Sequence, residues 1–246
     1  MTKYNISSRQ LAILSAVIEE FLNSEELEMI PSALIVKQYD IDVCPATVRT
    51  EMAKLEREGF LTKPHISAGR VPSDIGIKYY ISQIMEEQHI PLTIQEKIKN
   101  SISNYTDNLN HLLYKTSEIL SNLTDEPVVT SFENATIQKG IYKLHKYTEL
   151  YSPNHLFEAL AYIENTQQIM DKVRNSHDQI FVLVGDDFEQ RDLSMYGMVG
   201  IKINGYKGKK GIISVFSSKR MNYSTIIPLV RFVGQLLSKK LQKWNW

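Results

Sequence analysis

Apolar residues recur at helical spacing in three separate stretches before residue 60. In the first stretch, residues 8–22, they form one broad stripe: Leu11, Ala12, Ile13, Leu14, Val17, Ile18, Phe21 and Leu22. A shorter stripe follows in residues 32–39, and a third lies in residues 45–57. Residues three and four apart share one face of a helix, so each stripe predicts an amphipathic helix. Gly59 predicts the end of the third helix, because glycine adopts the left-handed conformation at little cost.

A β-hairpin is predicted directly after these helices. Residues 60–62 favour a strand, residues 63–70 form a loop punctuated by proline and glycine, and Val71 can begin the returning strand. A capped helix over residues 74–88 follows. The order helix, helix, turn, helix and hairpin is that of a winged helix-turn-helix.

The middle of the chain is less regular. Apolar residues spaced near 3.5 predict a long helix over residues 92–123, which can pack in the core or against a second copy of the chain. Residues 124–139 look irregular, apart from a candidate strand at residues 128–130.

The last hundred or so residues change period from helix to strand and back. Helices are predicted over residues 153–175 and 224–243, and strands over residues 179–184, 195–203 and 211–217. Two or three antiparallel strands with helices make a small module, so the predicted fold class is α+β.

Composition places the chain among ordinary globular proteins of the cytosol. It has 246 residues, of which 43% are hydrophobic and 23% charged, and a formal net charge of zero. Cys44 is the only cysteine, which excludes an internal disulfide and suits a reducing compartment. No apolar run reaches the roughly 18 residues of a membrane span. We therefore expect a cytoplasmic protein without a membrane partner.

The third helix and the hairpin together suggest a surface that binds double-stranded DNA. A helix fits the major groove of B-DNA, and a basic loop beside it can reach phosphates or the minor groove. The candidate DNA-binding residues lie opposite the apolar stripe of the helix and in the loop: Thr47, Arg49, Thr50, Lys54, Lys63, His65, Ser67, Gly69 and Arg70. The alternative is a surface helix and hairpin that pack on the protein's own core.

Charge complicates this hypothesis. Residues 1–88 hold nine Lys and Arg against thirteen Asp and Glu, a net charge of −4, whereas DNA-binding domains are usually basic. Residues 60–72, however, contain no acid. Residues 201–220 are also free of acids and carry six cations, a pattern that suits DNA phosphates, an acidic partner or a solvated hairpin equally well.

No arrangement of residues indicates catalysis or a cofactor. The six histidines are scattered, and phosphate-binding glycine loops and zinc-protease motifs are absent from the sequence. Asp186 and Asp187 follow a predicted strand, but two adjacent carboxylates alone make a poor cation site. Cys44 precedes the third helix and would sense oxidants only if its pKa were lowered. We expect neither an enzyme nor a bound cofactor.

Residues 45–80 resemble the signature of the HrcA family of heat-inducible transcription repressors. The matching segments are ATVRTEMAKLEREGFL (46–61), KPHISAGRVPSD (63–74) and KYY (78–80), with weaker likeness in residues 150–173 and 217–227. The resemblance implies a homodimer that binds an inverted repeat called CIRCE and represses chaperone operons, with a GroEL-type chaperonin as a further partner. It also implies a winged helix, a GAF-like domain and a dimerising domain inserted in the latter.

Departures from the family pattern define the domains that we expect. Much of the family's middle region is missing, since residues 124–139 stand where a whole domain would lie. We therefore expect a winged-helix DNA-binding domain at 1–90, a linker or dimer helix at 91–125, and a shortened GAF-like α+β domain at 126–246. The competing hypothesis is a regulatory module whose winged helix binds a protein or a ligand instead of DNA.

Overall fold

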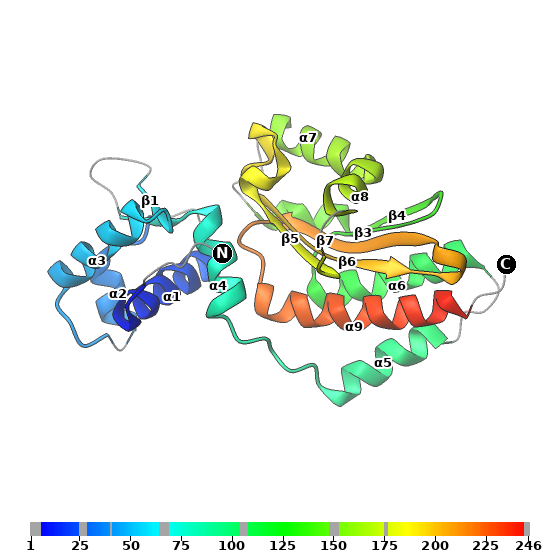
Figure 1. The fold of residues 1–246 in the computed structure, drawn as a ribbon, viewed down its shortest axis with the longest axis horizontal. Coiled ribbons are helices and arrows are strands. Elements are labelled where there is room, and N and C mark those ends of the chain that lie inside the picture. The colour runs from blue at the N-terminus through cyan, green and yellow to red at the C-terminus, as the bar shows by residue number, and fades with distance from the viewer. Residues whose placement is uncertain are drawn as a thin grey trace. The chain divides into compact units, whose positions relative to one another are not determined.

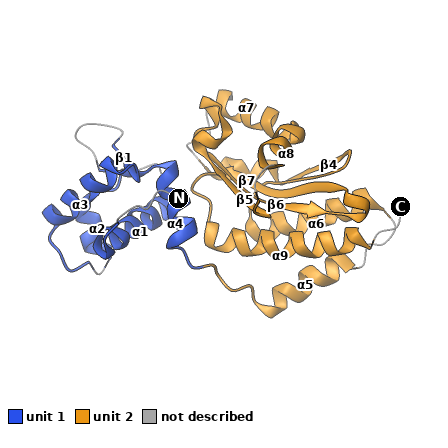
Figure 2. Cartoon of the chain, viewed as in Figure 1, with its two compact units in different colours: residues 1–86 blue, residues 87–246 orange. Residues whose placement is uncertain are grey.

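The computed structural model forms two compact units, residues 1–86 and residues 87–246 (Figure 2). It describes these ranges of the chain: 6–24, 29–39, 41–63, 69–103, 108–147, 153–174 and 177–243. None of the helices within them combines the length and the hydropathy that crossing a membrane requires.

The first unit contains four helices and one small hairpin among its described residues (Figure 1). In chain order the elements are α1 (Ser8–Asn23), α2 (Ser32–Gln38), α3 (Pro45–Arg57), β1 (Leu61–Thr62), β2 (Val71–Pro72) and α4 (Asp74–Gln83). The predicted helices, turn and hairpin are thereby confirmed in order and type. The fourth helix ends earlier than expected, because residues 85–90 have no regular structure.

Local capping explains where these helices begin and end. The Ser7 hydroxyl accepts a hydrogen bond from the Gln10 backbone N–H, and the Gln10 side chain accepts one from the Ser7 N–H, which forms a capping box. At the start of α4 the Ser73 hydroxyl accepts a single hydrogen bond from the backbone N–H of Gly76. Gly59 has a φ of 85°, the left-handed conformation predicted for the residue that ends α3.

The apolar stripes of the helices form the core of the first unit. Val48, Met52 and Leu55 of α3 are buried as predicted. In α1 the buried face is centred on Ile13 and Val17, whereas Leu11 and Leu22 at the two ends of the stripe are only half-buried. Burying a side chain of this size contributes roughly 1.5–3 kcal/mol, so these stripes hold the three helices together.

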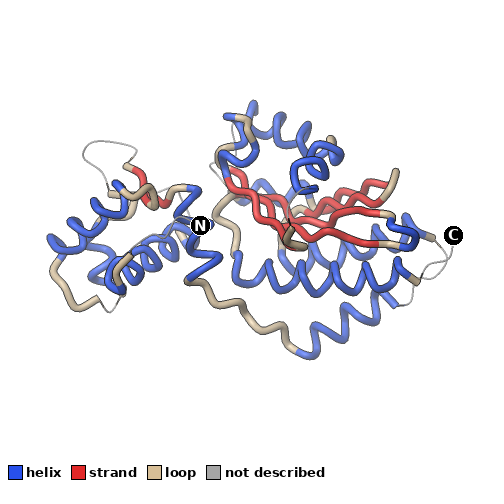
Figure 3. Tube along the Cα trace, in the orientation of Figure 1, coloured by secondary structure: helices blue, strands red, loops and turns tan. Residues whose placement is uncertain are grey.

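The second unit is built on a five-stranded antiparallel sheet, coloured red in Figure 3. Its strands are β3 (Val128–Phe132), β4 (Ala135–Lys139), β5 (Ile180–Val184), β6 (Tyr196–Asn204) and β7 (Lys210–Ser218), in the order β4-β3-β7-β6-β5. The expectation of two or three strands was wrong. Residues 124–139 are not irregular either, because they hold the β3–β4 hairpin, which pairs with β7 through β3.

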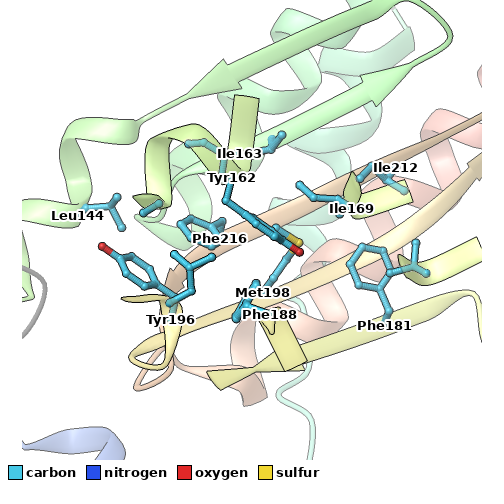
Figure 4. Close-up of a cluster of buried hydrophobic side chains, with 14 residues drawn as sticks. Leu144, Tyr162, Ile163, Ile169, Phe181, Phe188, Tyr196, Met198, Ile212 and Phe216 are labelled. Carbon is cyan, nitrogen blue, oxygen red and sulfur yellow. The ribbon is translucent and has the colours of Figure 1, made fainter. Parts of the chain in front are cut away.

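Helices cover both faces of this sheet (Figure 1). On one face lie α6 (Leu109–Thr124) and α9 (Tyr223–Gln242), and α5 (Leu92–Ser103) packs against these two helices. On the other face lie α7 (Pro153–Glu164) and α8 (Thr166–Arg174). Between this second helix layer and the sheet, Tyr162, Phe188 and Phe216 form part of a buried apolar cluster (Figure 4).

Two helices predicted as continuous are each divided. The pattern over residues 92–123 gives α5 and α6, because Asn108 adopts an extended conformation and caps α6 through the His111 backbone N–H. The pattern over residues 153–175 gives α7 and α8, which are separated at Asn165. Apolar spacing alone cannot reveal such breaks, since both halves of each pattern face the same core.

A candidate nucleic-acid interface

Helix α3 presents a polar surface opposite its buried stripe. Arg49 and Thr50 are exposed, and Thr47 and Lys54 are half-buried at the edges of that surface. Pro45 occupies the first helical position, where its missing N–H costs no hydrogen bond. The four residues of α3 that the sequence predicted for contact with DNA therefore lie on the surface or at its edges.

Three of these four side chains already have partners within the helix. Thr50 donates to the carbonyl oxygen of Ala46 at 3.1 Å, and Lys54 Nζ lies 2.8 Å from Oε1 of Glu51. The Thr47 hydroxyl lies 3.3 Å from the sulfur of Cys44. Within the described ranges, Arg49 makes no side-chain hydrogen bond or ion pair. Among these four side chains, the Arg49 guanidinium is thus the donor best placed to bind a ligand directly.

Cys44 lies just before α3 and is exposed to solvent. A hydrogen bond from the Thr47 hydroxyl, with help from nearby backbone N–H groups, lowers the pKa of the Cys44 thiol. A thiolate is favoured at a helix N-terminus, where backbone N–H groups point outward. The sequence could not show this effect, because it depends on the side chain of Thr47 folding back along the first turn.

The base of the hairpin is tied to α3. Nε of Arg70 donates a hydrogen bond of 2.7 Å to Oε2 of Glu56, and only 13% of the Arg70 side chain is exposed. Lys63, at the other side of the hairpin, is exposed. The tip, residues 64–68, lies outside the described residues, so the assignments of His65 and Ser67 to DNA binding stay predictions.

Ile30 adds a third segment to the hairpin, which the sequence did not predict. The backbone N–H and carbonyl groups of Ile30 and Arg70 form two hydrogen bonds, of 2.9 and 3.0 Å. A Cβ atom at Gly69 would lie 2.3 Å from the Ile30 carbonyl oxygen, so the chains can approach only because this residue is glycine. Gly69 therefore has a structural role at this crossing, whatever it contacts outside.

The basic run at residues 201–220 does not form one patch. Arg220 is buried, with only 4% of its surface exposed, and Lys209 Nζ lies 3.9 Å from Glu133. Lys202 and Lys210 line a separate cavity beneath α8. The sequence alone did not show that these cations lie apart. Neighbouring residues of a strand point to opposite faces of the sheet, so cations close in sequence can be on different surfaces.

Of the two adjacent carboxylates at residues 186–187, that of Asp187 binds the backbone. The Asp187 side chain accepts a hydrogen bond of 2.9 Å from the backbone N–H of Val184. Across the part of the chain that the structure describes, histidine, cysteine and carboxylate side chains form no group suited to hold a metal ion.

Comparison with known proteins gives one family. The model of the HrcA protein C terminal domain matches residues 78–227. The heat-inducible transcription repressor HrcA of Carboxydothermus hydrogenoformans is 38% identical over 119 residues, which are 48% of this chain and 34% of that protein. The HrcA repressor of Clostridioides difficile is 36% identical over 139 residues, 55% of this chain and 40% of that protein. The matched part thus spans little more than a third of these relatives.

A likeness in fold extends over nearly the whole chain. A crystal structure of a hypothetical protein superposes with a TM-score of 0.76, covering 98% of this chain and 100% of the other. The two sequences are 15% identical. The likeness therefore concerns the fold alone, and it supports the α+β class predicted from the sequence.

Proposed function

The chain belongs to the HrcA family, and on that premise we propose that it represses transcription by binding DNA through its first unit. In this proposal residues 1–86 form a winged helix, in which α3 is the recognition helix and the β1–β2 hairpin is the wing. The curated relatives are heat-inducible transcription repressors. The genes that this chain controls are accordingly heat-shock and chaperone genes.

One observation supports this proposal most directly. Arg49 is exposed near the N-terminus of α3, opposite the buried residues Val48, Met52 and Leu55. The N-terminal part of a recognition helix is the part that meets base edges in helix-turn-helix proteins. Arginine can donate two hydrogen bonds to guanine, which is the commonest specific contact in the major groove.

The remaining parts of the proposal concern the operator and the partners. We propose that two copies of the chain bind an inverted repeat resembling CIRCE, since a symmetric dimer on a palindrome places one α3 in each half-site. A GroEL-type chaperonin is proposed as a further partner on family grounds alone. The second unit, residues 87–246, is proposed to be the family's GAF-like domain.

A binding experiment tests the proposal. Fluorescence anisotropy would compare a labelled duplex that carries an inverted repeat with a scrambled duplex, at several salt concentrations. We expect tighter binding to the repeat, and a steep loss of affinity with salt on both duplexes because phosphate contacts release counterions. The variant Lys97→Ala removes an exposed cation of the second unit. It should bind both duplexes as the parent protein does, because the proposal places DNA binding in the first unit.

A second function has support from charge. Lys54 and Arg70 are paired with Glu51 and Glu56, and residues 1–88 have a net charge of −4, which weakens attraction to phosphates. A winged helix that binds a basic or neutral protein or a ligand would fit this balance. That alternative predicts no measurable affinity for any duplex at low salt, which would rule out the repressor proposal.

A further inference from the structure

A cavity of about 350 Å³ lies between α8 and the sheet of the second unit. Volumes of about 300–1,000 Å³ are typical of sites for small molecules. The cavity is bounded by the last turns of α8, by residues 177–179 just before β5, and by the adjoining ends of β6 and β7. It belongs wholly to the second unit and is distinct from α3 and the hairpin.

The strand register explains why cations line this cavity. Lys202 pairs with Ile212 and Asn204 pairs with Lys210 in the β6–β7 ladder. Paired residues of antiparallel strands project from the same face, and so do residues two apart on one strand. All four side chains therefore extend the sheet face that carries Met198 and Phe216 of the apolar cluster (Figure 4).

The lining combines an apolar inner part with a polar rim. Met170 and Val173 of α8 and Ile212 of β7 provide the apolar surface. Ile212 belongs both to this lining and to the buried apolar cluster, so the cluster borders the cavity. Binding sites for small molecules commonly have this composition, in which apolar walls bury the ligand body and a few polar groups orient it.

The rim of the cavity carries more positive than negative charge. Among the described residues of the lining, Arg174, Lys202 and Lys210 are the lysine and arginine cations, and Asp178 is the one carboxylate. Arg174 also forms an exposed ion pair with Asp171, which is not part of the lining. A carboxylate or sulfonate held near Lys202 and Lys210 would gain charge-assisted hydrogen bonds, the stronger kind.

We propose that this cavity binds a small organic anion with an apolar body, such as an aryl or alkyl carboxylate or sulfonate. The anionic group lies at the rim between Lys202 and Lys210. The apolar body lies against Met170, Val173 and Ile212. Lys202 and Lys210 of the acid-free run thus have a function in ligand binding that is separate from DNA.

A fluorescent dye of this chemistry provides the test. Anilinonaphthalene sulfonate would be titrated into the full chain, with one saturable site expected. The double variant Lys202→Gln, Lys210→Gln should bind the dye about tenfold more weakly, because two hydrogen bonds from charged groups are lost at a partly solvated rim. Lys239→Gln, an exposed lysine of α9, should leave the affinity unchanged.

Two further measurements keep the test decisive. Arg174→Glu changes an exposed side chain at the rim and should weaken dye binding even if the double variant fails to fold. Naphthalene sulfonate should displace the dye, whereas inorganic sulfate at the same concentration should not. Equal affinity in Arg174→Glu and the parent protein, or displacement by sulfate alone, would overturn the proposal.

Discussion

Arg70 at the base of the hairpin and Glu56 in the last turn of α3 are joined by a hydrogen bond of 2.7 Å between Nε and Oε2. The pair connects two elements that are both proposed to contact DNA. It also neutralises an arginine that the sequence assigned to a phosphate. In this structure, a phosphate that binds the Arg70 guanidinium has to compete with Glu56.

That relationship gives a prediction in which two variants act in opposite directions. Glu56→Gln should tighten binding to specific and random duplexes, since it releases the positive charge of Arg70 towards phosphate. Arg70→Ala should weaken binding to both and lower the slope of log affinity against log salt by about one unit. Losing the pair should also lower the free energy of unfolding by about 1 kcal/mol, measured by urea denaturation. If both variants weaken DNA binding, the ion pair supports binding by stabilising the hairpin, and the proposal that Arg70 contacts a phosphate is wrong.

Arg49 should determine sequence preference. Arg49→Ala should cost about 1–3 kcal/mol on the inverted repeat and much less on the scrambled duplex, because a bidentate contact to guanine is lost. Competition anisotropy with both duplexes measures the difference. Thermal stability should not change, since the side chain is exposed. An equal loss on the two duplexes would instead assign Arg49 to a phosphate.

The Cys44 thiol should react as a thiolate at lower pH than an ordinary cysteine. Its pKa is lowered by the Thr47 hydroxyl, so the fraction of thiolate at a given pH is raised. The rate of alkylation by iodoacetamide, followed by mass spectrometry, should therefore reach half its maximum at a lower pH than in Thr47→Val. Identical pH profiles for the two proteins would show that Thr47 has no such effect.

In the second unit, Glu126 is a buried carboxylate held by three side chains. Ser217 of β7 donates to it at 2.6 Å, the Tyr147 hydroxyl donates a further hydrogen bond, and Lys146 Nζ lies 3.0 Å away. Burial raises the pKa of Glu126, and these partners oppose the rise without cancelling it. Only 3% of the residue is exposed, which accounts for the dominance of burial.

The raised pKa gives a stability prediction with a definite sign. The folded state binds the Glu126 proton more tightly than the unfolded state, so this residue makes the free energy of unfolding fall as pH rises from about 4 towards neutral. Glu126→Gln should remove that contribution. The measurement is the free energy of unfolding of variant and parent, obtained from guanidinium denaturation across this pH range. The value for the variant minus the value for the parent should increase as pH rises. A pH-independent difference would contradict the assignment.

Long periodic stretches of the fold could be predicted from the sequence, and short or buried ones could not. The stripe of α3 was sufficient because one face of that helix lies in a core, and the turn-rich connection at residues 204–209 was sufficient to predict the β6–β7 hairpin. In contrast, β3 is buried along its whole length, and β4 is a five-residue edge strand, so neither shows a clear alternation. The family of transcription repressors was recognised from the α3 and hairpin motifs, which also supports the prediction that the chain is not an enzyme.

The candidate site was predicted in its composition but not in its connections. The position of Arg49 opposite Val48 and Met52 follows from helical spacing. The pairing of Arg70 with Glu56, and of its backbone with Ile30, joins residues far apart in sequence. No local pattern encodes such contacts, since they depend on where the hairpin packs. The close approach of Gly69 to the Ile30 backbone belongs to the same class of contact, and the assignment of Gly69 to DNA binding stays a prediction.

The pairing of β3 with β7 has a consequence for synthesis of the chain. Val129 and Ser214, which are in contact across these strands, are 85 residues apart. At a translation rate of about 5–20 residues per second, β3 waits roughly 4 to 17 seconds for its partner. The first unit is complete by residue 86 and can fold on the ribosome during that time. The β3–β4 hairpin meanwhile presents an apolar strand with one open edge, so the nascent second unit is the part of this protein most exposed to aggregation.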